Sequence, residues 1–155
     1  MVTMVITTDG FRPGERIPDK YTCEGRDISP ALRWKSVPAG TQSLALILDD
    51  PDAPMGKFTH WLVCNIPPDK GGLPEGVPMR AVLPDKSRQG VTGFGREGYG
   101  GPCPPPGKPH RYYFRLYALD RKIDLAPGFR QKDLEDAMRG HILAQGELMG
   151  TFSRG

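Results

Sequence analysis

Two continuous apolar runs of strand length stand out along the chain. The first is "SLALIL" (Ser43–Leu48), and the second is "FTHWLVCNI" (Phe58–Ile66), which Pro67 and Pro68 follow directly. Runs of this length are typical of strands that are buried on both faces, and proline stops such a strand because it has no N–H to donate. We therefore predict two buried strands.

A third segment, "HRYYFRLYAL" (residues 110–119), alternates between two kinds of side chain. One face carries His110, Tyr112, Phe114, Leu116 and Ala118, and the other carries Arg111, Tyr113, Arg115 and Tyr117. Because successive side chains of a strand point to opposite faces, this pattern predicts a strand with one drier face.

Glycine and proline are dense between these strands, from residue 67 to residue 107. The stretches "PPDKGGLPEGVP" and "GFGREGYGGPCPPPG" predict two long irregular loops. Since strands resume afterwards, we interpret them as functional loops on one scaffold.

The C-terminal part of the chain is more helical in its pattern. The segment "QKDLEDAMRGHILAQGELM" places Leu134, Met138, Ile142 and Leu148 near helical spacing, with glycines between them. We predict one or two short helices here, after the strands of a mainly β chain.

Length and charge narrow the possible partners. The 155 residues fit one domain spanning 1–155, and 21 basic residues are scattered among 18 acidic ones to give a net charge of +3. No electrostatic stripe suits nucleic acid or a membrane surface, and the arginines between the aromatics of residues 110–117 fit an ordinary polar strand face. We expect a small molecule or a protein as partner, and no nucleic acid.

Nothing in the sequence marks secretion or a membrane span. The N-terminal stretch "MVTMVITTDGF" lacks the features of a signal peptide, and no run approaches the roughly 20 apolar residues that cross a bilayer. The three cysteines are odd in number and lack CxxC spacing, which disfavours a disulfide framework and a structural zinc site. We expect a cytoplasmic protein without a transmembrane segment.

Candidate chemistry gathers at the predicted strand ends. Asp49, Asp50 and Asp52 follow the first strand, His60 lies near the start of the next, and His110 opens the third. On strand periodicity, Asp50 continues the face of the first strand's leucines, and His110 and Tyr112 continue the face of Phe114. If these faces meet, polar groups gather at the mouth of an apolar interior.

A plain structural interpretation of the same residues stays open. Asp50 and Asp52 fit a turn around Pro51, and His60 fits a satisfied core histidine. The loop "GFGREG" matches G-x-G-x-x-G, but no strand precedes it and no helix follows, so it does not predict a dinucleotide site.

Three segments together resemble the phosphatidylethanolamine-binding protein family, in its bacterial and archaeal branch. They are "DDPDAP" (Asp49–Pro54), "GYGGPCPPPGKPHRYYF" (Gly98–Phe114) and, more weakly, "YTCEGRDISPALRW" (Tyr21–Trp34). Their order and separation fit that family over nearly the whole chain. The resemblance implies a large central antiparallel sheet packed on a smaller β-sheet, with short C-terminal helices.

The resemblance also implies a small anion pocket at one rim of the sheet. Its expected ligand-binding residues are Asp50, Asp52, His60, Gly101, Pro102, His110 and Tyr112. Imidazole and phenol groups can donate to phosphoryl oxygens, whereas a carboxylate only accepts, so we expect the aspartates to orient the histidines. The resemblance implies no metal and no cofactor.

Three functional hypotheses follow. The leading one is a binding protein for a small anionic or phosphorylated group; the resemblance adds a regulatory version, inhibition of a kinase or a serine protease through the loops 67–84 and 90–107. A hydrolase that uses the histidines and aspartates, with or without a metal, is the alternative. The resemblance also implies a homodimer, and it leaves open whether Cys23 and Cys103 pair, with free thiols as the favoured expectation.

Overall fold

The computed structural model describes residues 2–155, and most of its regular structure is β-strand. The strands are β1 (Val2–Thr3), β2 (Val5–Thr8), β3 (Leu32–Lys35), β4 (Ser43–Asp50), β5 (Phe58–Ile66), β6 (Gly72–Leu73), β7 (Arg88–Gln89), β8 (His110–Leu119) and β9 (Ile142–Phe152). One short 3-10 turn, η1 (Asp19–Tyr21), and one α-helix, α1 (Gln131–Met138), complete the described elements.

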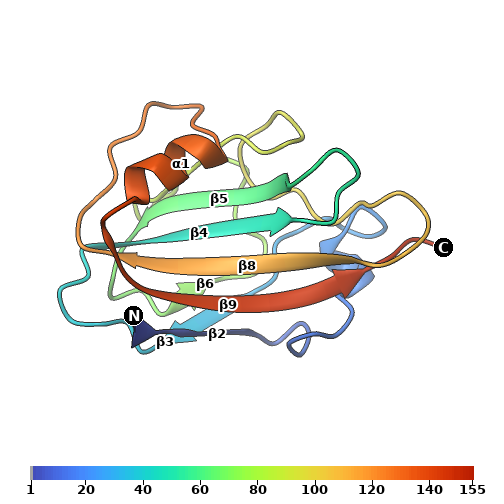
Figure 1. Cartoon of the computed structure of the whole chain (residues 1–155), viewed down its shortest axis with the longest axis horizontal. Coiled ribbons are helices and arrows are strands. Elements are labelled where there is room, and N and C mark those ends of the chain that lie inside the picture. Colours follow the sequence, from blue (N-terminus) through green and yellow to red (C-terminus); the bar gives the residue numbers. More distant parts are fainter. Residues whose placement is uncertain (1) are drawn as a thin grey trace.

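The strands form a large sheet and a small one (Figure 1). The large sheet has the order β1-β9-β8-β4-β5-β7, and the small sheet has the order β2-β3-β6. Every pair within the large sheet is antiparallel except the edge pair β1 and β9, which is parallel. The predicted architecture of a large sheet packed on a smaller one is confirmed. The large sheet is antiparallel except for the parallel pair at its β1 edge.

Apolar side chains fill the space between the two sheets. The main core joins β4, β5, β8 and β9 of the large sheet to Ile6, Leu32, Trp34 and Leu73 of the small sheet. The opposite face of the large sheet is covered by α1, where Leu134 and Met138 pack against Ile47 and Leu62. Strand β4 is buried along its whole length because it lies between these two layers, as its apolar run predicts.

The C-terminal prediction is half right. Helix α1 covers residues 131–138, but residues 142–149, also predicted as helical, belong to strand β9. The helix ends at Met138, and Gly140, just beyond the C-cap Arg139, has a φ of 82° in the left-handed region that turns the chain away from the helix. A spacing of four residues fits both one helical turn and two strand periods, so Ala144, Leu148 and Phe152 share one buried strand face.

The expectation of free thiols is also wrong for two of the three cysteines. Cys23 and Cys103 form a disulfide, while Cys64 is free and buried in β5. Their segments lie 80 residues apart in sequence, and spacing alone contains no information about such a long-range approach.

The register of the large sheet brings the ends of four strands to one rim. Asp50, the last residue of β4, pairs with Phe58, the first of β5, and His110, the first of β8, pairs with Phe152, the last of β9. This confirms the predicted convergence of strand ends. The residues singled out in the sequence therefore come within reach of one another.

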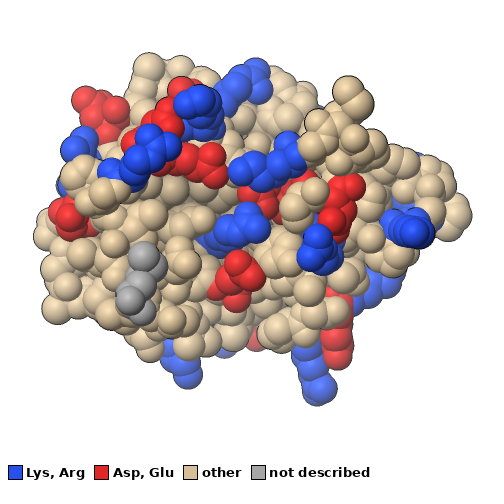
Figure 2. All heavy atoms as spheres, in the orientation of Figure 1, with Lys and Arg blue, Asp and Glu red and all other residues tan. Residues whose placement is uncertain are grey.

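Charges of both signs lie side by side on the face shown in Figure 2. That face carries no broad region of a single sign, in agreement with the scattered charges of the sequence. Within residues 2–155, the structure contains no helix with the length and hydropathy needed to span a bilayer.

Candidate functional site

A cavity of about 180 Å³ opens at the rim where β4, β5 and β8 meet. Four predicted site residues, Asp50, His60, His110 and Tyr112, line it. The remaining lining residues come from three loops and the start of β5: Ala53, Pro54, Phe58, Phe94, Cys103, Pro104 and Pro105. Polar groups thus form one part of the wall, and apolar rings and prolines form the rest.

Asp50 holds His110 in one orientation. The Nδ1 atom of His110 lies 2.7 Å from Oδ2 of Asp50, and because a carboxylate only accepts, Nδ1 carries the proton. The other carboxylate oxygen of Asp50 accepts the backbone N–H of Asp52 at 2.8 Å, which closes the turn around Pro51. Asp50 therefore fixes both the turn and the imidazole, as the sequence predicts.

His60 is fixed in a different way. Its Nδ1 lies 2.7 Å from the carbonyl oxygen of Gly100, so Nδ1–H donates to this carbonyl and Nε2 is left with a lone pair. Burial lowers the pKa of His60, although the charges of Asp50 and Asp27 and the Gly100 carbonyl oppose this effect. His60 therefore remains neutral near pH 7 and offers a hydrogen-bond acceptor.

Tyr112 carries an unpaired polar atom at the cavity. Its side chain is fully buried, and its hydroxyl is the one buried side-chain N or O atom among residues 2–155 that has no hydrogen-bond partner. Burial is the main cause that raises the pKa of Tyr112, followed by the charge of Asp50 and the approach of its carboxylate, so the hydroxyl keeps its proton. An unpaired buried hydroxyl costs about 1–3 kcal/mol, and a ligand that accepts from it recovers this cost.

Aromatic rings pack around these polar groups. The rings of Phe58 and Phe94 lie 4.9 Å apart between centroids, and both pack edge-on or tilted against His60 at 5.0 and 5.4 Å. Tyr112 meets the other side of His60 edge-on at 5.3 Å. This packing leaves His60 little freedom to rotate.

Three residues predicted for the site lie outside the cavity wall. Asp52 turns outward and binds Arg111 on the exposed face of β8, where this ion pair lowers the pKa of Asp52 to about 2. The N–H of Gly101 donates to Asp27, so it does not face the cavity, and Pro102 does not line it. The predicted outward direction of Arg111 is confirmed.

The sequence reasoning missed the apolar part of the wall. The motif "GPCPPPG" did point to this part of the wall. The prediction chose Pro102, whereas the residues that line the cavity are Pro104 and Pro105, two and three positions later. Phe94 lies in a loop that the sequence analysis interprets as functional, but no local pattern singled out this residue as part of the cavity wall.

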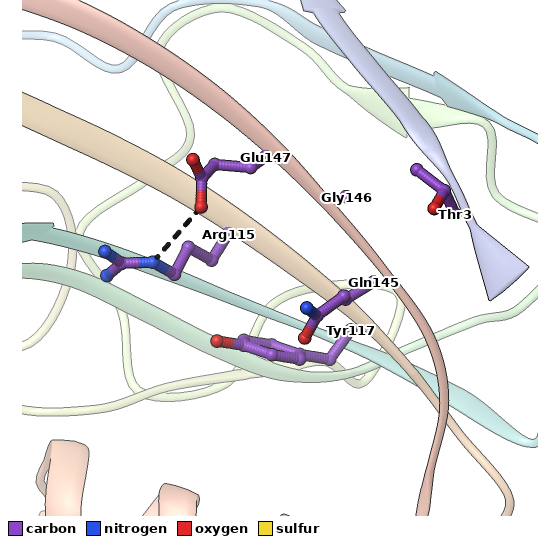
Figure 3. Close-up of a pocket in the computed structure, with 6 residues that line it drawn as sticks. All are labelled: Thr3, Arg115, Tyr117, Gln145, Gly146 and Glu147. Carbon is purple, nitrogen blue, oxygen red and sulfur yellow. Dashed lines mark ion pairs between the residues drawn. The ribbon is translucent and has the colours of Figure 1, made fainter. Parts of the chain in front are cut away.

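A second, larger hollow lies on the opposite face of the large sheet (Figure 3). It is lined by Thr3, Arg115, Tyr117, Gln145, Gly146 and Glu147 and has a volume of about 320 Å³. Its guanidinium, Arg115, already pairs with Asp49 and with Glu147, whose Oε2 lies 3.7 Å from Nε. Because its charges are paired, we place the candidate site at the cavity near His60.

The donor set at the cavity consists of two imidazoles, one phenol and one carboxylate. Nowhere within residues 2–155 do three or more His, Cys, Asp or Glu side chains converge as metal ligands. The fold and the cavity thus define a class: a two-sheet β protein with a small cavity at the strand ends, lined by two held histidines and one unpaired tyrosine hydroxyl.

The comparisons with known proteins identify the family within this class. The phosphatidylethanolamine-binding protein family matches residues 7–153, and the chain belongs to this family. A protein of Methanothermobacter thermautotrophicus named UPF0098 protein is 53% identical over 98% of this chain and 100% of its own length.

Two solved structures share the fold. One is a phosphatidylethanolamine-binding protein homologue, CT736 of Chlamydia trachomatis, with a TM-score of 0.89, 41% identity and full coverage of both chains. The other is YbcL of E. coli, described as a member of the mammalian family, with a TM-score of 0.92, 33% identity, and coverage of 99% of this chain and 100% of its own.

Proposed function

We propose that this protein binds a small phosphoryl group, and that its preferred form is the one that keeps a single P–OH proton. The observation that carries the proposal is the unpaired Tyr112 hydroxyl, buried at a cavity that two histidines also line. With Nδ1 of each ring committed, Nε2 of His60 and Nε2 of His110 remain for a ligand.

The roles of the three groups follow from their protons. Tyr112 donates, and His110 donates through Nε2 when it carries its second proton, so both match bare phosphoryl oxygens. Neutral His60 accepts, so it matches a P–OH group. The cavity of about 180 Å³ is smaller than the roughly 300–1,000 Å³ of drug-sized pockets, which fits a small head group.

Calorimetry with inorganic phosphate and with sulfate tests this proposal. Sulfate has the same shape and bears no proton at neutral pH, so it leaves the acceptor of His60 unpaired. We expect sulfate to bind at least about tenfold more weakly, because an unpaired buried acceptor costs about 1–3 kcal/mol. Equal affinities, or no heat with phosphate and phosphoethanolamine, would contradict the proposal.

The variant Tyr112→Phe isolates the hydroxyl. We expect it to weaken phosphate binding about tenfold and to leave the free energy of unfolding the same or about 1 kcal/mol higher, because it removes an unpaired polar atom. Tyr113→Phe, on the opposite face of β8, is the matched control and should leave binding unchanged. Binding that survives in Tyr112→Phe would remove the central donor from the proposal.

A protein-directed role, the inhibition of a kinase or a serine protease, would use the loops around the cavity. The large exposed hydrophobic side chains near the rim lie on these loops: Met55 is 99% exposed, Met79 49% and Phe94 41%. Methionine and aromatic residues are enriched at protein interfaces. Inhibition that Met55→Ser and Phe94→Ser reduce would support this role, and a kinase and protease panel without inhibition at micromolar protein would contradict it.

A further inference from the structure

The segment "YTCEGRD" (Tyr21–Asp27) is distant in sequence from the cavity, and none of its residues lines it. It nevertheless holds the loop that supplies part of the cavity wall. The links between the two segments are the Tyr99 hydroxyl donating to the Tyr21 carbonyl (2.6 Å), the Cys23 N–H donating to the Pro102 carbonyl (3.1 Å), the Cys23–Cys103 disulfide, and the Gly101 N–H donating to Oδ1 of Asp27 (2.8 Å).

One of these links leads directly to the site. The carbonyl of Gly100, which accepts Nδ1–H of His60, and the N–H of Gly101, which donates to Asp27, belong to the same peptide unit. The N–H of Gly100 in turn donates to the carbonyl of His60 at 2.9 Å. A single amide therefore connects the carboxylate of Asp27 to the imidazole of His60.

We infer that Asp27 is a positioning residue that fixes the tautomer of His60 through this amide. A carboxylate at the N–H end of an amide polarises it and makes its carbonyl oxygen a stronger acceptor. The stronger acceptor keeps the proton of His60 on Nδ1 and leaves the lone pair on Nε2 for the ligand. The effect of this tautomer on phosphate binding rests on the proposed function.

The backbone is shaped for this contact. Asp27 has a φ of 57°, in the left-handed region, which aspartate and asparagine adopt more often than most residues other than glycine. A Cβ atom at residue 101 would lie 2.2 Å from the carbonyl oxygen of Tyr21 and 2.5 Å from Oδ1 of Asp27. Only glycine permits this close approach.

A carboxylate thus orients each of the two histidines of the cavity, one directly and one through a peptide unit. Asp50 contacts Nδ1 of His110 directly at 2.7 Å, whereas Asp27 acts on His60 through one peptide unit. The second oxygen of Asp27 lies 4.0 Å from a guanidinium nitrogen of Arg96. The carboxylate therefore has one partner on each oxygen.

The test compares Asp27→Asn and Asp27→Ala by NMR of histidine-labelled protein without ligand. The ring ¹⁵N and ¹³C shifts report the tautomer of His60, and the exchange rate of its Nδ1–H reports the bond to Gly100. We expect faster exchange and a mixed tautomer in Asp27→Ala. Asp27→Asn retains an acceptor without the charge, so we expect it to show a partial effect.

Phosphate affinity should follow the same order. We expect a loss of about tenfold in Asp27→Ala and about threefold in Asp27→Asn, as for a charged and a neutral hydrogen bond. Asp9→Asn is the matched control, because Asp9 forms an exposed ion pair with Arg33 away from the cavity. It should change neither the tautomer nor the affinity.

The outcomes separate this inference from the proposed function. A His60 ring in Asp27→Asn and Asp27→Ala with the wild-type tautomer and exchange rate would overturn the role of Asp27, whatever phosphate does. If the tautomer responds to Asp27 but the wild-type protein binds no phosphate, the role of Asp27 stands and the proposed function falls. If Asp27→Ala does not fold, the shifts of folded Asp27→Asn decide.

Discussion

His60 illustrates how burial gives one side chain a defined chemical role. It is 3% exposed, and its Nδ1–H is committed to the Gly100 carbonyl. Because burial lowers its pKa, the folded protein resists protonating it at a pH where an unfolded chain would not. The neutral state that makes His60 an acceptor for a ligand therefore also makes the stability of the fold sensitive to acid.

The sign of this effect follows from proton linkage. An unfolded histidine takes up a proton as the pH falls through its ordinary pKa of about 6.5, and folded His60 does so only at lower pH. The contribution of His60 to stability is thus complete above about pH 6.5 and decreases below it by up to about 1.4 kcal/mol per pH unit. We expect His60→Gln to lose less stability than wild type between about pH 7 and pH 5.

Urea denaturation at a series of pH values measures this difference. His141→Gln is the matched control, because His141, which lies just beyond α1, is partly exposed and forms an ion pair with Asp120. It should keep the steep acid loss that His60 causes. Parallel pH profiles for wild type and His60→Gln would contradict the assigned role of burial.

At the scale of elements, a buried charge joins β4, β8 and α1. Asp49 is fully buried, pairs with Arg115 of β8, and accepts from the Gln131 amide at 2.9 Å at the start of α1. It follows Leu48 in sequence but points to the α1 side of the sheet, whereas Asp50 points to the cavity. Alternation thus gives two adjacent aspartates two different tasks.

Removing Arg115 should leave the buried carboxylate of Asp49 without a cation, with only the Gln131 amide as a hydrogen-bond donor. We expect Arg115→Met to lower the free energy of unfolding by about 3–5 kcal/mol, as for a buried pair that loses one partner. Chemical denaturation measures it. Arg111→Met is the matched control on the same face of β8, and it should change stability little because its pair with Asp52 is exposed.

The double variant Asp49→Leu/Arg115→Met provides the second check. It removes both charges, so it should recover most of the stability lost in Arg115→Met. Failure to recover would mean that the loss comes from packing of the Arg115 side chain and not from the unpaired carboxylate.

For the whole molecule, the Cys23–Cys103 disulfide is the one covalent constraint in the described chain. It joins an N-terminal loop to the loop that lines the cavity and spans 80 residues of sequence. A crosslink of this kind reduces the entropy of the unfolded chain. It also keeps the loop beside Asp27 close to the site.

We expect reduction of this disulfide, or Cys23→Ser/Cys103→Ser, to lower the free energy of unfolding by about 2–4 kcal/mol. Guanidinium denaturation with and without reductant measures the loss. In the double variant, reductant should have no further effect, because Cys64 is already a free thiol. An equal response to reductant in both proteins would show that another process is being measured.

The sequence predicted the local features of this protein. Continuous and alternating apolar runs indicated β4, β5 and β8, because strand periodicity depends only on which side chains avoid water. The same alternation predicted that Asp50, His110 and Tyr112 point one way and Arg111 the other. It wrongly predicted helix for residues 142–149, which form part of β9, because a four-residue spacing fits both a helix and a strand.

Only the tertiary structure decided which distant groups meet. The Cys23–Cys103 pair, the contribution of Phe94 to the cavity wall and the Asp27 contact to the Gly100–Gly101 amide all depend on loops closing over many residues. The packing of the whole chain determines which of these loops come together, and the periodicity of the sequence does not predict it. The sequence by itself therefore determined the strands and the direction of their side chains, whereas packing determined how the site is closed and which residues hold its histidines.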